Sequence, residues 1–219
     1  MRQRFLVVSG FILAGGDSHR MGKPKDQLEL GGEIVLERQV RLVHSVTRSV
    51  AVLGPMDRLA GTGFNVIPDD RPGGGPLGGI LTALRHTRSD YNLIVGCDLP
   101  FLEARFLRYL CARALTTEAE VTVPESPGRE IHPTCAVYRR QALRAARGGL
   151  ERGDFSARGF FPRVRVQVLC WAEITRAGFS ARNLVNMNTP EEFHAARLRL
   201  DWQTRSLGPL GETRAAPKD

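Results

Sequence analysis

The residues from Leu13 to Lys25 constrain the fold of this 219-residue chain more than any other stretch. They read LAGG, three residues, RMG, two residues, Lys, and they follow an apolar run from Phe5 to Leu13. The run predicts a buried strand, and the small side chains after it let backbone N–H groups approach a ligand. A glycine turn at the carboxyl end of a parallel strand is where open α/β sheets bind anions. We therefore expect an anion-binding loop at the edge of a sheet.

This loop differs from two well-known phosphate-binding loops. Its first two glycines are adjacent, so it does not fit the GxGxxG pattern. It is not a Walker A loop either, because Gly22-Lys23 is followed by Pro24 and not by the Ser or Thr that would hold a metal ion. Arg20 and Lys25 add positive charge close to the glycines. Glycines and cations directly after a strand favour binding of a phosphate-bearing ligand over an ordinary turn.

Apolar runs and amphipathic segments alternate along the rest of the chain. Further strands are predicted at 49–53, 64–67, 91–97, 120–124, 134–138 and 164–171, and helices at about 34–46, 77–88, 103–115, 141–150, 156–161 and from 189 onward. This alternation predicts an α/β fold: a Rossmann-like, doubly wound, mostly parallel sheet with helices on both faces and an antiparallel pair in the later part. Residues 1–202 are expected to form a single domain, and residues 203–219 a disordered tail.

Two aspartates follow predicted strands on the same edge of the sheet as the glycine loop. Asp98 comes directly after the strand at 91–97, where a carboxylate beside phosphates requires a cation between them. Mg²⁺ fits, because it binds one or two carboxylates together with phosphate oxygens and water. Asp69 follows the strand at 64–67 and could bind a ribose hydroxyl or a base edge. The alternatives are a helix cap for Asp98 and a solvated loop position for Asp69.

Three further stretches contain candidate ligand contacts. The glycines at 73–79, with Gly78 among them, let the backbone approach a ligand, although a glycine turn before a helix needs none. His132 leads into a strand, a place where a lone histidine is usually structural. Asn186 and Asn188 stand before the last helix, where turn and cap chemistry explains them equally well.

Charge and cysteine content restrict the class of partner and the location. The net charge of +8 suits an anionic partner, and it is spread as scattered arginines without interleaved aromatics, which does not favour nucleic acid. No apolar stretch approaches the about 20 residues that cross a membrane. Four cysteines without CxxC or metal-ligand spacing are expected to be reduced and mostly buried, as in a cytoplasmic protein.

The motifs taken together resemble the molybdenum cofactor guanylyltransferase family. LAGG…RMG…K, VIPDD, GPLGGI, CDLPFL, IHPT and NMNTPEEF occur in one order between Phe11 and Leu198. The glycine loop and CDLP alone would indicate only the wider nucleotidyltransferase superfamily. The resemblance implies transfer of GMP from GTP to Mo-molybdopterin, with release of pyrophosphate and formation of the guanine dinucleotide cofactor.

The resemblance also assigns roles to individual residues. GTP would be bound by the loop residues Leu13, Ala14, Gly15 and Gly16, by Lys25 and by Gly78, with its guanosine part on Asp69 and its Mg²⁺ on Asp98. Arg20, Lys25 and Asp98 would carry the catalysis. The pterin side of the cleft would be formed by His132, Asn186 and Asn188. Molybdoenzymes or other proteins of cofactor biosynthesis are the implied protein partners.

One departure from the family pattern leaves the base specificity open. The family often has an asparagine after the second strand as a base contact, and here that segment is Val52-Leu53-Gly54-Pro55. The alternatives are therefore a molybdopterin cytidylyltransferase, a sugar-phosphate or phospholactate nucleotidyltransferase, or a non-catalytic nucleotide-binding protein. The last is disfavoured because both Lys25 and Asp98 are present.

Overall fold

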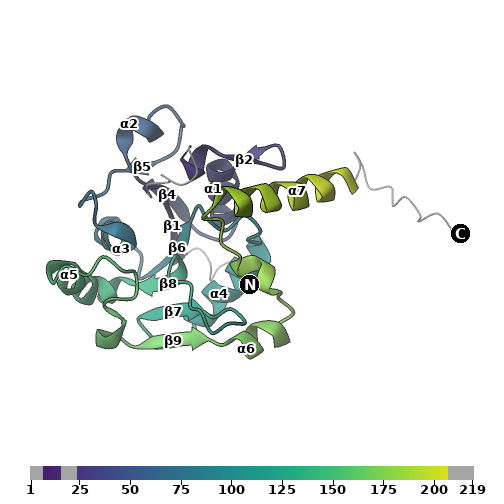
Figure 1. Cartoon of the computed structure of the whole chain (residues 1–219). Helices are drawn as coiled ribbons and strands as arrows, with labels where there is room; N and C mark the ends of the chain where they lie inside the picture. Colours follow the sequence, from purple (N-terminus) through teal and green to yellow (C-terminus); the bar gives the residue numbers. More distant parts are fainter. Residues whose placement is uncertain (1–6, 16–23, 207–219) are drawn as a thin grey trace, which may run out of the picture.

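The computed structural model describes residues 7–15 and 24–206 of the chain. Within them, seven strands form one sheet (Figure 1). Their order is β5 (Val66–Ile67), β4 (Ser49–Leu53), β1 (Val8–Leu13), β6 (Tyr91–Gly96), β8 (Cys135–Arg139), β7 (Val121–Pro124) and β9 (Val166–Leu169). Only β8 runs antiparallel to its neighbours; the other described pairs are parallel. The predicted mostly parallel sheet with a later antiparallel pairing is confirmed.

Strand β1 occupies the centre of the parallel part. Phe11 is in register with Ala51 of β4 on one side and with Ile94 of β6 on the other. From β1 the chain proceeds outward through β4 and β5, and it then returns to place β6 on the opposite side of β1. The strand order therefore reverses between β1 and β6, and the carboxyl ends of strands at such a reversal form the usual ligand-binding crevice of open α/β sheets.

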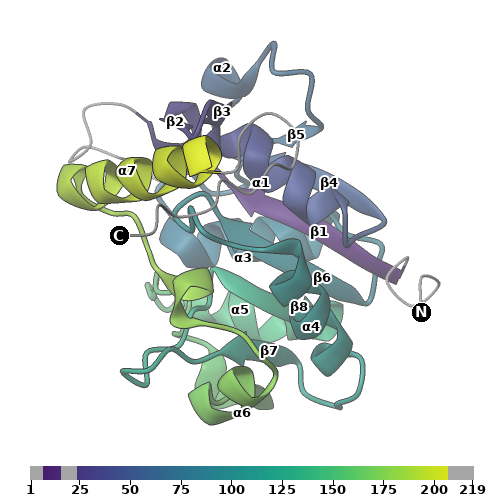
Figure 2. The ribbon, with the colours of Figure 1, turned by 90° about the vertical axis from the view of Figure 1, so that its right-hand side faces the viewer.

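Helices cover both faces of the sheet (Figures 1 and 2). Helices α3 (Gly75–His86) and α5 (Leu143–Glu151) lie on one face, and α1 (Val35–His44) and α4 (Ala104–Ala114) on the other. The remaining described elements are the hairpin of β2 (Glu29–Leu30) and β3 (Glu33–Ile34) and the helices α2 (Met56–Leu59), α6 (Trp171–Arg176) and α7 (Pro190–Ser206). None of the described helices has the length and apolarity needed to cross a bilayer.

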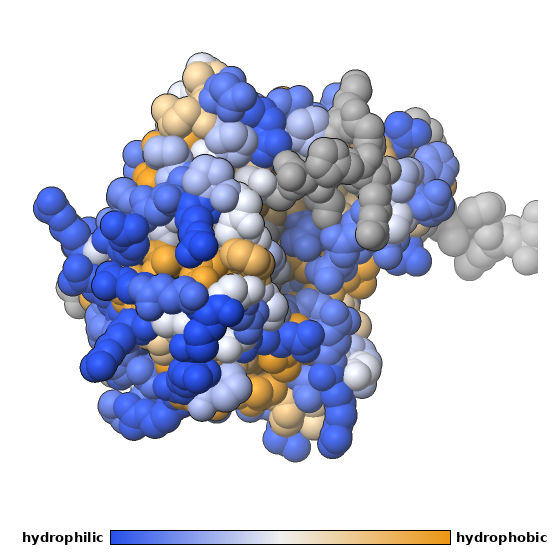
Figure 3. Space-filling model, turned by 60° about the vertical axis from the view of Figure 1, so that its left-hand side comes forward, coloured by the Kyte–Doolittle hydropathy of each residue, from blue (hydrophilic) through white to orange (hydrophobic). Residues whose placement is uncertain are grey.

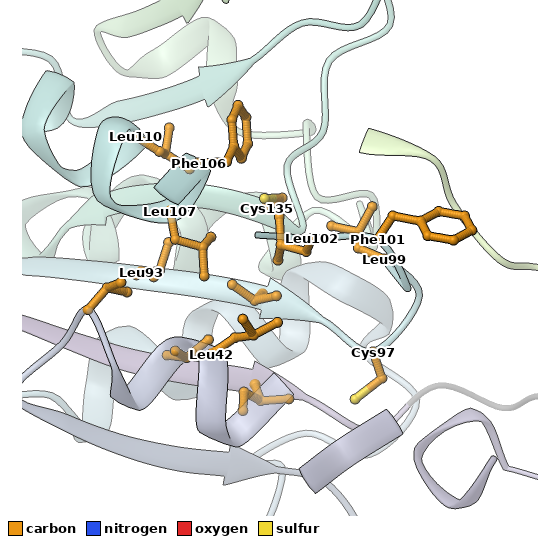
Figure 4. Packing of buried hydrophobic residues seen from close by; sticks show 14 of the residues in the cluster. Leu42, Leu93, Cys97, Leu99, Phe101, Leu102, Phe106, Leu107, Leu110 and Cys135 are labelled. Atoms are coloured by element: carbon orange, nitrogen blue, oxygen red, sulfur yellow. The ribbon is translucent and has the colours of Figure 1, made fainter. Parts of the chain in front are cut away.

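The alternation of side chains along β1 divides the hydrophobic core into two clusters. Val8 and Ile12 contribute to the cluster beneath α1 and α4, and Phe11 contributes to the cluster beneath α3 and α5. Helix α1 packs very close to β1, since a Cβ on Gly10 would lie 2.2 Å from Cγ1 of Val43. Figure 4 shows how residues after β6, among them Leu99 and Leu102, join the first cluster. The segment that follows β6 is thus anchored in the core.

Most predicted elements are confirmed to within a few residues, and the differences involve short elements. The helix predicted at 156–161 is wrong: the chain there forms turns and then a 3₁₀ turn at Phe161–Arg163. Helices α2 and α6 were not predicted. Helix α7 continues to Ser206, so the first residues of the expected tail are helical, and residues 207–219 lie outside the described part.

The prediction that most cysteine side chains are buried is confirmed. Cys97, Cys111 and Cys135 are buried and Cys170 is exposed. Burial raises the pKa of the Cys111 thiol to about 12, so this side chain stays protonated at neutral pH.

Candidate active site

A cleft of about 910 Å³ opens at the carboxyl ends of β1, β4, β5 and β6. It lies at the reversal of strand order, where the fold predicts a ligand site. In the space-filling view this face is hollowed beside the grey atoms (Figure 3). The lining comes from five segments of the chain, at 13–15, 53–57, 68–76, 79 and 96–98, together with Asp26 and Thr134. Segments far apart in sequence therefore meet at this edge.

The start of the glycine loop lines the cleft as predicted. Ala14 donates its N–H to the carbonyl of Leu53 at 2.8 Å, which fixes the backbone as it leaves β1. The next residue, Gly15, is exposed, and a Cβ there would lie only 2.6 Å from Oδ2 of Asp69. A glycine at this position lets the Asp69 carboxylate approach the loop. The loop and the aspartate after β5 thus form one continuous surface.

Several predicted loop residues fall outside the described part or are described only in part. Gly16 and Arg20 lie among residues 16–23, outside the described residues. Lys25 begins a 3₁₀ turn, Lys25–Gln27, which leads to the hairpin of β2 and β3. The predictions that Gly16, Arg20 and Lys25 bind phosphate stay predictions.

Asp69 and its neighbour Asp70 have different environments. Burial raises the pKa of the Asp69 carboxyl, and the nearby charge of Asp70 raises it further. Asp70 is tied to α3 instead: its N–H donates to Oγ1 of Thr82, and its carboxylate lies 3.0 Å from Nη1 of Arg85 and 3.1 Å from Nε2 of His86. These contacts with α3 hold Asp70 away from the cleft, whereas Asp69 lines it.

The glycine-rich stretch borders the cleft at the start of α3. Gly73, Gly74, Gly75 and Gly79 are lining residues. Gly78 is not among them, and its contact with the nucleotide stays a prediction. Its N–H already donates to the carbonyl of Gly74 inside the helix, because α3 begins two residues earlier than predicted. Its neighbour Gly79 lies against Leu13, with only 2.9 Å between a Cβ placed there and Cδ2 of that leucine.

Asp98 lies on the opposite side of the cleft and is held by its backbone. The carbonyl of Asp98 accepts the N–H of Met187 at 2.7 Å, and the carbonyl of the next residue, Leu99, accepts Nε2 of Gln39 at 2.9 Å. Gln39 and Met187 are fully buried. A Cβ on Gly96 would lie 2.6 Å from Oδ1 of Asp98, so glycine is needed here as well. The backbone that carries this carboxylate is therefore held by buried hydrogen bonds.

Of the residues predicted for the pterin side, His132 lies near Asp98, and Asn186 and Asn188 flank a backbone partner of Asp98; none of the three is among the residues that line the cleft. His132 is 5% exposed, and its Nε2 has no hydrogen-bond partner among the described residues. Burial lowers the pKa of its imidazole, and the charges of Glu130 and Asp98 oppose this shift. Asn186 and Asn188 flank Met187, so the hydrogen bond from Met187 to Asp98 brings both asparagines to this side. Their contact with a pterin stays a prediction.

The pairing of the lining residue Asp26 with Arg58 was not predicted from the sequence. Asp26 lines the cleft although it is only 4% exposed, and Oδ2 lies 3.2 Å from Nε of Arg58 on α2. Arg58 also donates a hydrogen bond from Nη2 to the carbonyl of Ala14. The only available signal was the place of Asp26 directly after Lys25; nothing in the sequence pairs it with Arg58.

The donor set suits a metal ion that takes most of its ligands from a bound molecule. No group of three or more His, Cys, Asp or Glu side chains within the described residues could hold a metal alone. Asp98 offers one carboxylate to an open cleft. Mg²⁺ is commonly held by one or two carboxylates together with substrate phosphates and water. The cleft thus fits Mg²⁺ bound together with a polyphosphate.

Comparison with known proteins agrees with this geometry. Residues 10–166 match the sequence model of the MobA-like NTP transferase domain. A "probable molybdenum cofactor guanylyltransferase" from Pelotomaculum thermopropionicum is 32% identical over 88% of this chain and 93% of its own length. A molybdenum cofactor guanylyltransferase from Shewanella sp. strain MR-4 is 30% identical over 85% of this chain and 93% of its own.

A solved structure shares the fold. Molybdopterin-guanine dinucleotide biosynthesis protein A from Archaeoglobus fulgidus superposes with a TM-score of 0.77 at 19% identity, covering 87% of this chain and 97% of its own. At that identity the likeness concerns the fold alone, and it confirms the predicted nucleotidyltransferase fold.

Proposed function

This chain belongs to the molybdenum cofactor guanylyltransferase family of MobA-like NTP transferases, and we propose that it transfers GMP from GTP to Mo-molybdopterin. The terminal phosphate oxygen of the pterin forms a bond to the α-phosphorus of GTP, and the bond from that phosphorus to the bridging oxygen breaks. The products are the guanine dinucleotide cofactor and pyrophosphate.

The observation that carries the proposal is the convergence of Gly15, Asp69 and Asp98 in one cleft. These residues follow three different strands, β1, β5 and β6. A loop that admits phosphates, a carboxylate for the nucleoside and a carboxylate for a metal ion are the parts that nucleotidyl transfer needs. A regulatory protein without catalysis would not require Asp98 to be fixed as firmly as it is.

The chain's own residues act mainly by binding and alignment. The attacking phosphate is already anionic at neutral pH, so the reaction needs no general base. The backbone of Leu13–Gly15 and the side chains of Arg20 and Lys25 would hold the triphosphate and stabilise charge growing on the leaving pyrophosphate. Asp69 would accept hydrogen bonds from the guanosine. Holding both substrates in line at the α-phosphorus supplies the remaining acceleration.

Asp98 would hold a Mg²⁺ ion together with the phosphates of GTP. When bound, this ion supplies Lewis-acid stabilisation of the α-phosphate. The fit rests on the place of the Asp98 carboxylate in the cleft and on the preference of Mg²⁺ for oxygen ligands. On the other side of Asp98, His132, Asn186 and Asn188 would contact the pterin.

The product and its location imply further partners. A cofactor made in this cleft must pass to the enzymes that use it, so we place molybdoenzymes or other biosynthesis proteins among the partners. We place the protein in the cytoplasm, whose reducing conditions suit four cysteines without a CxxC pair.

The first test is calorimetric titration of the purified protein with GTP, CTP, UTP and ATP in the presence of Mg²⁺. The proposal predicts a strong preference for GTP, followed by Mg²⁺-dependent pyrophosphate release when Mo-molybdopterin is added. Preference for CTP would instead assign a cytidylyltransferase, as Leu53-Gly54 after β4 leaves open. GTP binding without pyrophosphate release in the presence of the pterin would indicate a non-catalytic nucleotide-binding protein.

A further inference from the structure

We propose that Arg58 is a positioning residue for the bound nucleotide, since its guanidinium joins the two segments on either side of residues 16–23. The inference rests on the proposed function and adds to it a residue that acts through the backbone of the glycine loop. Arg58 lies on α2, an element that the sequence did not predict.

The contacts of this side chain are unusual in what they connect. Nη2 donates to the carbonyl of Ala14, the residue before Gly15 in the cleft. Nε lies 3.2 Å from Oδ2 of Asp26, the residue after Lys25. A single side chain therefore contacts both the backbone of Ala14 in the LAGG motif and the turn that carries Lys25, the last residue of the LAGG…RMG…K pattern. Movement of either segment would break one of the two contacts.

The ion pair is well shielded from water. The Asp26 side chain is 4% exposed and the Arg58 side chain 18% exposed. Burial raises the pKa of the Asp26 carboxyl, and the charge of Arg58 acts against that shift. In such surroundings the loss of one partner leaves the other charge uncompensated, whereas replacing both partners by neutral groups often costs little stability. The double substitution should therefore restore stability without restoring nucleotide affinity, and this difference distinguishes a positioning role from a merely stabilising one.

Helix α2 is itself part of the cleft wall. Met56 and Asp57 line the cleft, and Leu59 is 1% exposed and packs in the core. The short helix is thus anchored in the core by Leu59, while Met56 and Asp57 line the cleft. Arg58 transmits that fixed position to Ala14 and Asp26. We therefore expect its loss to act on nucleotide affinity more than on the chemical step.

The test compares GTP affinity, kcat and thermal stability in three variants of the full chain. Arg58→Lys keeps the charge but cannot contact Ala14 and Asp26 with one planar group, and Asp26→Asn breaks the ion pair. The double variant Asp26→Asn/Arg58→Met removes both charges. The matched control is Arg41→Ala on α1, which breaks an exposed pair with Glu33 of β3; neither residue lines the cleft.

The expected result is a loss of GTP affinity of roughly tenfold in each of the three variants, with a much smaller change in kcat. The double variant should regain the thermal stability of the unaltered protein while its GTP affinity stays low. The control should bind GTP normally.

Normal GTP affinity in Arg58→Lys or in the double variant would overturn the inference. An unaltered protein that binds a nucleotide other than GTP would contradict the proposed function instead. The Arg58 comparison would then be made with the nucleotide that binds, so the two failures stay distinguishable.

Discussion

The two walls of the cleft make room for a carboxylate in the same way but support it differently. On the wall formed by β1, β4 and β5, a Cβ on Gly15 would crowd Asp69; on the wall formed by β6 and β8, a Cβ on Gly96 would crowd Asp98. Both distances are 2.6 Å. Each wall thus places a glycine beside an aspartate: the fold brings Gly15 and Asp69 together, whereas Gly96 and Asp98 are two residues apart in the sequence.

The supports of the two aspartates differ in chemistry. The Asp98 segment is held by uncharged, buried hydrogen bonds from Gln39 and Met187. The Asp69 wall depends on charged side chains, with Asp70 bound to α3 through Arg85 and His86 and the loop bound to α2 through Arg58. Uncharged buried bonds hardly respond to salt or pH, whereas charged contacts do. The wall on which we propose the metal ion is thus held by uncharged contacts, and the wall on which we propose the nucleoside is held by charged ones.

The largest expected effect comes from removing the carboxylate of Asp98, on the wall formed by β6 and β8. Asp98→Ala should lower Mg²⁺-dependent turnover by at least ~10³-fold, because the metal-bound phosphates lose their protein ligand. Pyrophosphate release under saturating GTP and pterin measures it. The unfolding midpoint should change little, since the backbone contacts of this segment remain. Retention of substantial turnover would remove Asp98 from the metal site.

The two glycines allow the walls to be broken one at a time. Gly96→Ala should displace Asp98 and lower kcat by ~10–100-fold, because small misplacements of catalytic groups are costly. Gly15→Ala should displace Asp69 and raise KM for GTP by about tenfold while kcat falls less. Gly128→Ala is the control, because a Cβ there meets nothing within 4 Å. Identical kinetic effects of the two glycine variants would mean that the two walls do not act separately on kcat and on KM for GTP.

Acidification should affect the wall that carries Asp69. The folded-state pKa of Asp69 is raised above the ordinary value of 3.8, so its contribution to stability is present below that value and is lost as pH rises through the folded pKa. At neutral pH the ionised carboxylate therefore destabilises the free protein. Asp69→Asn should raise the melting temperature at pH 7 and lose this advantage near pH 3.8.

The same substitution should lower GTP affinity about tenfold, because a carboxylate is the stronger acceptor. GTP affinity of the unaltered protein should also fall on acidification, starting above the ordinary pKa of aspartate. Calorimetry across a pH series measures both effects. Equal GTP affinity of Asp69→Asn and the unaltered protein at neutral pH would exclude Asp69 from the nucleotide contact.

The smallest effect concerns Gln39, which supports the wall that carries Asp98. Gln39→Leu leaves the carbonyl of Leu99 without its donor, which should cost about 1–2 kcal/mol of the free energy of unfolding. It should lower kcat a few-fold without changing KM for GTP. Denaturant unfolding and steady-state kinetics measure the two quantities, with Gln141→Leu at an exposed position as control. A change in KM for GTP without a change in kcat would contradict the assignment of Gln39 to the wall that carries Asp98.

The sequence predicted the elements that long patterns determine. β4 was predicted at its observed bounds because SVAVL is apolar and bounded by turns, and Asp69 and Asp98 were found because each follows such a strand. Helix α2 was missed because its four residues are too few for helical periodicity to appear. Arg58 was missed with it, since its partners lie far away in sequence.

Gly78 illustrates a different limit of the sequence. A run of glycines predicts close approach of the backbone to a ligand, but the bounds of the helix decide which glycine faces the cleft. Because α3 begins at Gly75, the N–H of Gly78 is used inside the helix and Gly79 reaches the lining instead. Helix bounds depend on local capping, which sequence patterns define only within a few residues.

The hydrogen bond between Met187 and Asp98 also bears on how the protein is made. A chain leaving the ribosome exposes β1, β4, β5 and β6 first, so the wall carrying Asp69 can assemble while synthesis continues. The wall carrying Asp98 lacks its backbone partner until residue 187 has emerged. We therefore expect a nascent or prematurely terminated chain to retain nucleotide without completing transfer, and catalytic competence to arrive only after residue 187 has emerged.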